Sequence, residues 1–178
     1  PCERCDGAGR VVAEKELEVE IPAGIHDGQR IRIRGAGHAG GNGGLPGDAY
    51  VEVRVAPDPR FERDGDDILS GVELTIVQAA RGATVTVPTL DGDHELELEP
   101  GTQPGEIRVL RGKGMPSIQR SGRGDHRLVV GVVVPRRLSD EQRELLDRFE
   151  VLSGEDTYRR DEGFFENRFF EKLRNAIR

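Results

Sequence analysis

The chain has 178 residues, which is enough for one domain or two small ones. Charged residues make up 33% and aromatic residues only 4%, so the core must be built mainly from Val, Ile and Leu. The net charge of −7 argues against nonspecific binding to nucleic-acid phosphates, and the sequence has no run of about 18 apolar residues that could span a membrane.

Alternating apolar and charged residues predict a mainly β structure up to Pro135. Residues 11–21 end with Leu17, Val19 and Ile21 on one face and glutamates on the other, the pattern of a half-buried strand. Residues 75–82 indicate a short helix or turn. Further strands are predicted in four stretches: residues 28–35, 48–57, 83–101 (two strands joined through Asp91-Gly92) and 125–135.

The pattern changes from β to helical after Pro135. Ser139 stands three residues before Gln142, the spacing of a capping box that begins a helix, and the apolar residues that follow share one face. A polar stretch, residues 153–163, separates this helix from the end of the chain. The last stretch places Phe165, Phe169, Leu173 and Ile177 at the spacing of an amphipathic helix.

Two stretches of the chain align without a gap at a constant spacing of 77 residues, as from Gly24 to Gly101. Apolar strand positions keep the same spacing, so the chain carries two copies of one β module, residues 19–55 and 96–132. The matched glycines and aspartates are Gly24, Gly28, Gly35, Gly37, Gly47 and Asp48 in the first copy and Gly101, Gly105, Gly112, Gly114, Gly124 and Asp125 in the second.

The glycine-rich stretch 34–48 could be a phosphate-binding loop, or it could serve only to reverse the chain direction. A phosphate loop needs a helix after it and usually a Lys, whereas this stretch leads into a β pattern and contains no Lys. Three of its glycines, Gly35, Gly37 and Gly47, recur in the second copy, whose loop has the same length but is less rich in glycine. They are better explained as backbone positions that need a positive φ or a close approach.

The motifs resemble one protein family along nearly the whole chain. "PCERCDGAGR" resembles the last Cys-x-x-Cys-x-Gly-x-Gly repeat of DnaJ-type J-domain co-chaperones, and "LSDEQRELLDRF" resembles the segment that leads to their dimerisation helix. Between them lie, in the family's order, motifs similar to the two C-terminal β-domains: "IPAGIHDGQRIRIRGAG", "GDAYVEVRV", "PDPRFERDGDDI", "VPTLDG" and "PGTQPGEIRVLRGKGMP".

This resemblance implies a cytoplasmic homodimer that holds unfolded polypeptides and delivers them to a DnaK-type ATP-dependent chaperone in protein folding and the stress response. The implied fold is two tandem β-sandwich or barrel modules followed by a short α-helical dimerisation tail. The expected boundaries are 1–10 for the last cysteine-rich repeat, 11–67 for a first β-domain that is incomplete at its start, 68–137 for the second and 138–178 for the tail. A His-Pro-Asp triplet is absent, so we expect the client-binding part of a longer protein.

Cys2 and Cys5 form a Cys-x-x-Cys knuckle, which supplies two of the four thiolates of a tetrahedral zinc site. In the family this repeat shares zinc with the first repeat, so we expect zinc to be absent or incomplete here. The remaining possibilities are a free dithiol, a disulfide, zinc shared with another chain, or a redox pair, although the βαβ context of a thioredoxin-like site is missing.

Phe61 is the only Phe of the β region, and it matches an aromatic that helps to line the family's groove for client segments. An ordinary core Phe between domains is the competing interpretation. The apolar residues of the tail could pack within the chain, but a self-complementary patch favours a dimer contact. The residues assigned to that contact are Phe165, Phe169, Phe170, Leu173 and Ile177.

The sequence indicates no enzyme. Asp125 and His126 are adjacent, and adjacent strand residues point to opposite faces, while Ser139 has the position of a helix cap. Two hypotheses from other classes remain as alternatives. One is a structural or carbohydrate-binding tandem β-module protein, which would expose strand aromatics such as Tyr50, and the other is a thiol oxidoreductase.

Overall fold

The computed structural model describes residues 5, 11, 13–41 and 44–158. The chain divides into two compact units, residues 1–134 and residues 135–178. The first unit is mainly β where it is described, and the second contains a helix, which confirms the predicted fold class. The finer division of residues 1–134 at residue 67 stays a prediction.

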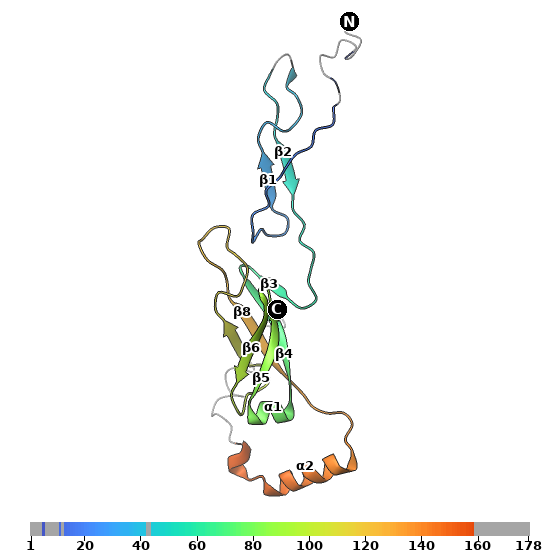
Figure 1. Cartoon of the computed structure of the whole chain (residues 1–178), viewed down its shortest axis with the longest axis vertical. Coiled ribbons are helices and arrows are strands. Elements are labelled where there is room, and N and C mark those ends of the chain that lie inside the picture. The colour runs from blue at the N-terminus through green and yellow to red at the C-terminus, as the bar shows by residue number, and fades with distance from the viewer. Residues whose placement is uncertain (1–4, 6–10, 12, 42–43, 159–178) are drawn as a thin grey trace, which may run out of the picture. The chain divides into compact units, whose positions relative to one another are not determined.

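The described part of the first unit contains short strands and one helix of six residues (Figure 1). The helix, α1 (Ile76–Arg81), begins with a capping box between Thr75 and Gln78, and it lies where a short helix or turn was predicted. The strands are β1 (Arg30–Ile33), β2 (Ala49–Glu52), β3 (Glu62–Asp64), β4 (Asp67–Thr75), β5 (Ala83–Thr89), β6 (Gly92–Leu98), β7 (Ile107–Leu110) and β8 (His126–Val133).

The strand predicted for residues 11–21 is wrong over the residues that are described there. Leu17 and Ile21 are exposed in an irregular segment. Alternation only makes a strand when a neighbouring strand accepts its backbone hydrogen bonds and covers its apolar face. Among the described residues no strand pairs with this segment, so the alternating pattern has nothing to pack against.

The largest sheet has the strand order β3-β4-β8-β7. Its two central strands, β4 and β8, run parallel over eight residue pairs from Ile68↔His126 to Thr75↔Val133. The outer strands pair antiparallel with them. Because parallel neighbours need a long crossover, the chain between β4 and β8 has room for α1, the β5-β6 hairpin and β7.

The hydrophobic core lies between this sheet and the β5-β6 hairpin, with α1 closing one end. β4, β6 and β8 each supply alternate residues to it, as the period of two predicts. The hairpin confirms the predicted pair of strands, with Thr89 opposite Gly92 around the turn. The buried core residues are Val72, Leu74, Ala79, Val87, Leu96, Leu98, Leu128 and Val130.

The repeat is present in the backbone as well as in the sequence. β1 pairs with β2 from Arg30↔Glu52 to Ile33↔Ala49, and β7 pairs with β8 from Ile107↔Val129 to Leu110↔His126. Each of these pairs is displaced by the same 77 residues that relate Gly24 to Gly101. The two copies therefore share strand pairing and register.

The loops of the two copies also use the same hydrogen bonds. The Asp48 carboxylate accepts from Gly35 N at 2.9 Å, and the Asp125 carboxylate accepts from Gly112 N at 2.8 Å. Gly35 and Gly112 both have φ +67°, a conformation that other residues rarely adopt. Backbone geometry thus accounts for these glycines, in agreement with the interpretation of residues 34–48 as a turning loop.

The second unit contains α2 (Asp140–Leu152) and a short 3₁₀ turn, Glu155–Tyr158. α2 begins with the predicted capping box, since Ser139 Oγ accepts from Gln142 N and the Gln142 side chain accepts from Ser139 N. Its apolar residues include Leu145, Leu146 and Phe149, and no residue of α2 is buried.

Candidate functional site: an apolar groove around Phe61

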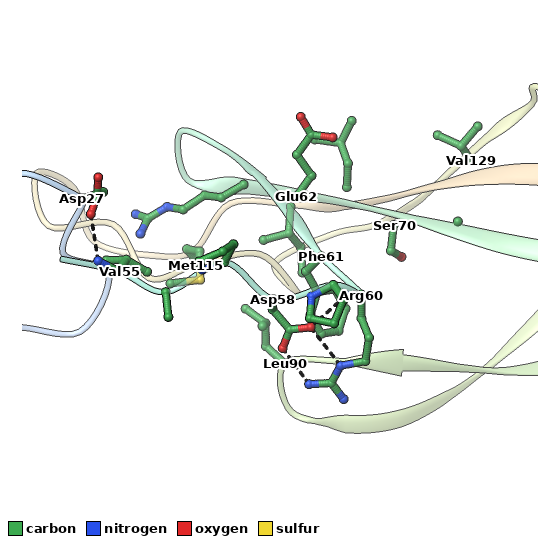
Figure 2. Close-up of a pocket in the computed structure, with 17 residues that line it drawn as sticks. Asp27, Val55, Asp58, Arg60, Phe61, Glu62, Ser70, Leu90, Met115 and Val129 are labelled. Carbon is green, nitrogen blue, oxygen red and sulfur yellow. Dashed lines mark hydrogen bonds and ion pairs between the residues drawn. The ribbon is translucent and has the colours of Figure 1, made fainter.

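A groove of about 850 Å³ surrounds Phe61 in the first unit. We call it the Phe61 groove. Figure 2 shows Phe61 between two groups of lining residues, with Asp27, Val55 and Met115 on one side and Ser70 and Val129 on the other. Its apolar lining includes Val55, Phe61, Leu69, Leu90, Met115 and Val129.

Phe61 is held in place by the tight turn that precedes β3. Phe61 N donates to Asp58 O at 3.3 Å, and the Arg60 side chain folds back so that its guanidinium carbon lies 5.1 Å from the centre of the Phe61 ring. Arg60 is fixed in turn by Asp58, at 2.9 Å between Nη2 and Oδ2. The hydrogen bonds from Arg60 lower the pKa of the Asp58 carboxyl to about 2, so the pair stays charged at neutral pH.

His126 supports the Phe61 ring from inside the protein. The two rings meet edge to face, with their centres 5.7 Å apart and an interplanar angle of 73°. His126 is fully buried, its Nε2 lies 2.7 Å from Ser70 Oγ, and its Nδ1 has no hydrogen-bond partner in the described structure. Burial lowers the pKa of His126, which favours the neutral form of this buried ring.

Both copies of the repeat contribute to the groove. Asp27 and Val55 come from the first copy and are joined to each other, because Val55 N donates to Asp27 Oδ1 at 2.8 Å. Met115 and Val129 come from the second copy. Phe61 lies in the connection between the copies, and it is half-buried.

Leu90 is placed on the groove by ion pairs of the residue next to it. Asp91 lies 2.8 Å from Arg123 Nη1 and 3.2 Å from Lys113 Nζ, and these hydrogen bonds lower the pKa of its carboxyl. The two basic residues belong to the loop 111–125 of the second copy. The turn of the β5-β6 hairpin is therefore tied to the loop that carries Met115.

The sequence singled out Phe61, which the structure places in the groove, but it did not single out the residues that surround Phe61. A buried His126 and its partner Ser70 give no periodic signal, because both occur at ordinary strand positions. Met115 is the only Met of the chain, and a single adaptable side chain in a glycine-rich loop is a signal that could have been used.

The predicted metal ligands are only partly described. Cys5 is half-buried and has a free thiol, and Cys2 lies outside the described residues. Within the described ranges, no group of three or more His, Cys, Asp or Glu residues could hold a metal ion. Cys2 and Cys5 together would supply two of the four ligands of a tetrahedral zinc site.

The remaining predicted residues are Asp125, His126 and the apolar residues of the tail. Asp125 accepts from Gly112 N and His126 contacts Ser70, so these neighbours bind different partners. Phe165, Phe169, Phe170, Leu173 and Ile177 lie outside the described residues. In the described part of the chain, no helix is both long and apolar enough to cross a membrane.

Comparison with known proteins agrees with the motifs. Residues 6–135 match the family described as DnaJ C terminal domain, and residues 141–178 match the family described as Chaperone protein DnaJ C-terminal region. The chain is 45% identical over 177 residues to the chaperone protein DnaJ of Parageobacillus thermoglucosidasius, covering 99% of this chain and 46% of that relative. It is 47% identical over 176 residues to that of Haloarcula marismortui, covering 99% of this chain and 44% of the relative. The chain thus spans about half the length of the curated relatives it matches.

Proposed function

Because the chain belongs to the DnaJ chaperone family, by its C-terminal domain, we propose that it binds unfolded polypeptides and that the Phe61 groove receives their apolar side chains. The observation that carries this proposal is a half-buried aromatic ring at the centre of an apolar groove that both copies of the repeat line. Family membership places the chain among chaperones, and capturing a client requires no catalytic residue.

The chemistry of the groove suits an apolar side chain of a client. Phe61 supplies an aromatic ring to the groove, and Leu69, Leu90 and Val129 add aliphatic carbon to its lining. The rim charges of Asp58 and Arg60 are already paired with each other, so they do not demand a charged ligand. β3 pairs with β4 over Asp67, Ile68 and Leu69 and ends there, so the edge of β4 beyond Leu69 is offered to an extended client main chain.

The direct test replaces Phe61 by Ala in the full chain and measures binding of fluorescein-labelled, reduced and carboxymethylated lactalbumin by anisotropy. We expect affinity to fall at least roughly tenfold, which corresponds to about 1.4 kcal/mol of binding free energy. Unfolding free energy should fall by less than the roughly 3–5 kcal/mol that a fully buried Phe→Ala change costs, because Phe61 is only half-buried.

Tyr50→Ala is the matched control. Tyr50 is the other aromatic residue of the β region and is 62% exposed on β2, outside the groove. Its replacement should leave lactalbumin binding unchanged. If Phe61→Ala binds like the unaltered chain, or if Tyr50→Ala loses as much affinity, the groove is not the client site.

We propose further that bound clients are passed to a DnaK-type ATP-dependent chaperone in the cytoplasm, as the resemblance implies. For zinc, we propose that Cys2 and Cys5 are ligands only where two further ligands meet them. Elemental analysis of the purified chain should then find much less than one zinc per chain. One zinc per chain that survives a chelator would contradict this assignment.

Dimerisation is also a proposal, and it assigns the contact to the five apolar tail residues Phe165, Phe169, Phe170, Leu173 and Ile177. The exposed apolar residues of α2 support it, since the second unit buries none of them within its described part. Deleting residues 164–178 should convert a dimer to a monomer in sedimentation at micromolar concentration. A full-length chain that is already monomeric would show that the tail packs in another way.

A further inference from the structure

The turn before β1 is bound to the strand β3 through a single arginine side chain. Arg63 donates from Nη1 to Ile25 O at 2.7 Å and from Nη2 to Gly24 O at 2.6 Å. Its Nε donates to Gly65 O at 2.8 Å. A planar guanidinium that binds three carbonyls through three different nitrogens fixes orientation as well as distance.

A second contact at the same turn joins the two copies backbone to backbone. Gly24 is buried, and a Cβ atom added to it would overlap the carbonyl oxygen of Pro116 and lie 2.8 Å from its carbonyl carbon. The repeat provides an internal comparison, because Gly101 has nearly the same φ, +82° against +87°. At Gly101 no described atom lies within 4 Å of an added Cβ. Gly24 therefore serves the contact with Pro116 in addition to the turn that both glycines share.

This pair of contacts lies beside the Phe61 groove. Asp27, which the first copy contributes to the groove, is three residues from Gly24 in the same turn, and Met115, which the second copy contributes, precedes Pro116. Met115 is itself held by a hydrogen bond from its N–H to Asp66 O at 2.8 Å. A movement at the contacts would shift Asp27 and Val55 relative to Phe61 and Met115.

We propose that Arg63 and the Gly24–Pro116 contact form a rigid joint that holds the first-copy residues of the Phe61 groove, Asp27 and Val55, at the spacing from Phe61 and Met115 that a client needs. Arg63 is then a positioning residue of the groove, in addition to lining it. This inference rests on the proposed function. Its energetic basis is pre-organisation of the groove. If the joint were loosened so that only about a tenth of the molecules held the binding-competent geometry, the apparent affinity for a client would fall roughly tenfold.

The joint itself is tested without any client. N–H residual dipolar couplings are measured in the full chain for two sets of amides, those of β1 and β2 and those of β4 and β8. Both sets should fit one alignment tensor. In Arg63→Ala the two sets should require two tensors, while the β4 and β8 amides keep their protection from hydrogen exchange. Arg63→Lys keeps the charge but loses the planar guanidinium that binds three carbonyls. The difference between its two tensors should be smaller than in Arg63→Ala. Arg108→Ala, a half-buried arginine of β7 in the same sheet, is the control and should keep one tensor.

Client binding is tested with labelled lactalbumin and the matched glycines. Gly24→Ala, which lies outside the groove lining, should weaken binding roughly tenfold as Arg63→Ala does, whereas Gly101→Ala should not. A single tensor in Arg63→Ala and Gly24→Ala overturns the joint. Two tensors with unchanged affinity overturn its positioning role. If Phe61→Ala loses binding while these variants keep it, only this inference fails, and if Phe61→Ala keeps binding, the proposed function fails.

Discussion

The two copies of the repeat have the same turns and the same strand register, yet they differ in depth of burial. In the second copy, β8 has β4 on one side and β7 on the other, and Leu128 and Val130 are 0% and 1% exposed. In the first copy, β2 pairs only with β1 among the described strands, and the counterparts Val51 and Val53 are half-buried. The shared sequence pattern therefore encodes the strand pairing, whereas the burial of the apolar side chains depends on which neighbouring strands cover them.

The largest effect should come from truncating the same apolar position in both copies. Leu128→Ala leaves a cavity in the closed core and should lower the unfolding free energy by about 2–5 kcal/mol. Val51→Ala, at the matched position, removes a half-buried side chain and should cost roughly 1 kcal/mol. Urea titrations followed by resolved amide signals of β2 and β8 measure the two losses separately.

Equal losses at the two positions would break the comparison. They would mean that β2 is covered in solution as fully as β8, by a segment that the described residues do not supply. If Val51→Ala lowers the unfolding free energy reported by the β1 and β2 signals and leaves that of β8 unchanged, the two copies unfold independently. That result would sharpen the comparison between them.

A smaller difference is expected at a glycine that both loops share. A Cβ at Gly37 would lie 2.6 Å from Asp48 O, within its own copy. A Cβ at Gly114 would lie 2.5 Å from Gly124 C and 2.7 Å from Asp66 O, the latter outside the repeat. Gly114→Ala should therefore lower global stability by about 1–3 kcal/mol, because the backbone of two segments must shift.

Gly37→Ala should instead loosen only its own loop. Thermal unfolding followed by circular dichroism gives the global effect, and amide exchange at Gly35 and Gly47 reports on the loop. If Gly37→Ala is as destabilising globally as Gly114→Ala, the first loop is coupled to the core more tightly than the contacts indicate.

Local sequence signals predicted the turns, the hairpin and the capped helix after Pro135, because these are set by residues near one another. Ser139 with Gln142 and the matched glycines are examples in which the chemistry is contained in a few positions. The strand predicted for residues 11–21 failed because its formation depends on a partner. The groove was predictable at Phe61 but not at His126 or Arg63, since their contacts join positions 56 and 38 residues apart, Ser70 with His126 and Ile25 with Arg63.

The smallest effect should appear in the pH dependence of stability, at a position where the copies carry different residues. His126 has Ala49 as its counterpart, so only the second copy places a titratable ring in its core. Burial holds the pKa of His126 below its ordinary value of 6.5. As the pH falls through about 6.5, the unfolded chain takes up a proton at this side chain that the folded chain resists, so the unfolding free energy decreases.

His126 therefore contributes its full stability above about pH 7.5, and the loss develops between there and its lowered folded pKa. The Asp58 carboxyl does not overlap this window, because its pKa of about 2 places its own loss of stability at much lower pH. Urea unfolding of the full chain at pH 7.5 and pH 5.5 should show lower stability at the acidic pH, and His126→Leu should reduce that difference. Leucine fills a similar space without a proton site, and Ser70 is accessible enough to bond water in place of the imidazole. If the difference in unfolding free energy between the two pH values persists unchanged in His126→Leu, another group is responsible for the titration and His126 is not.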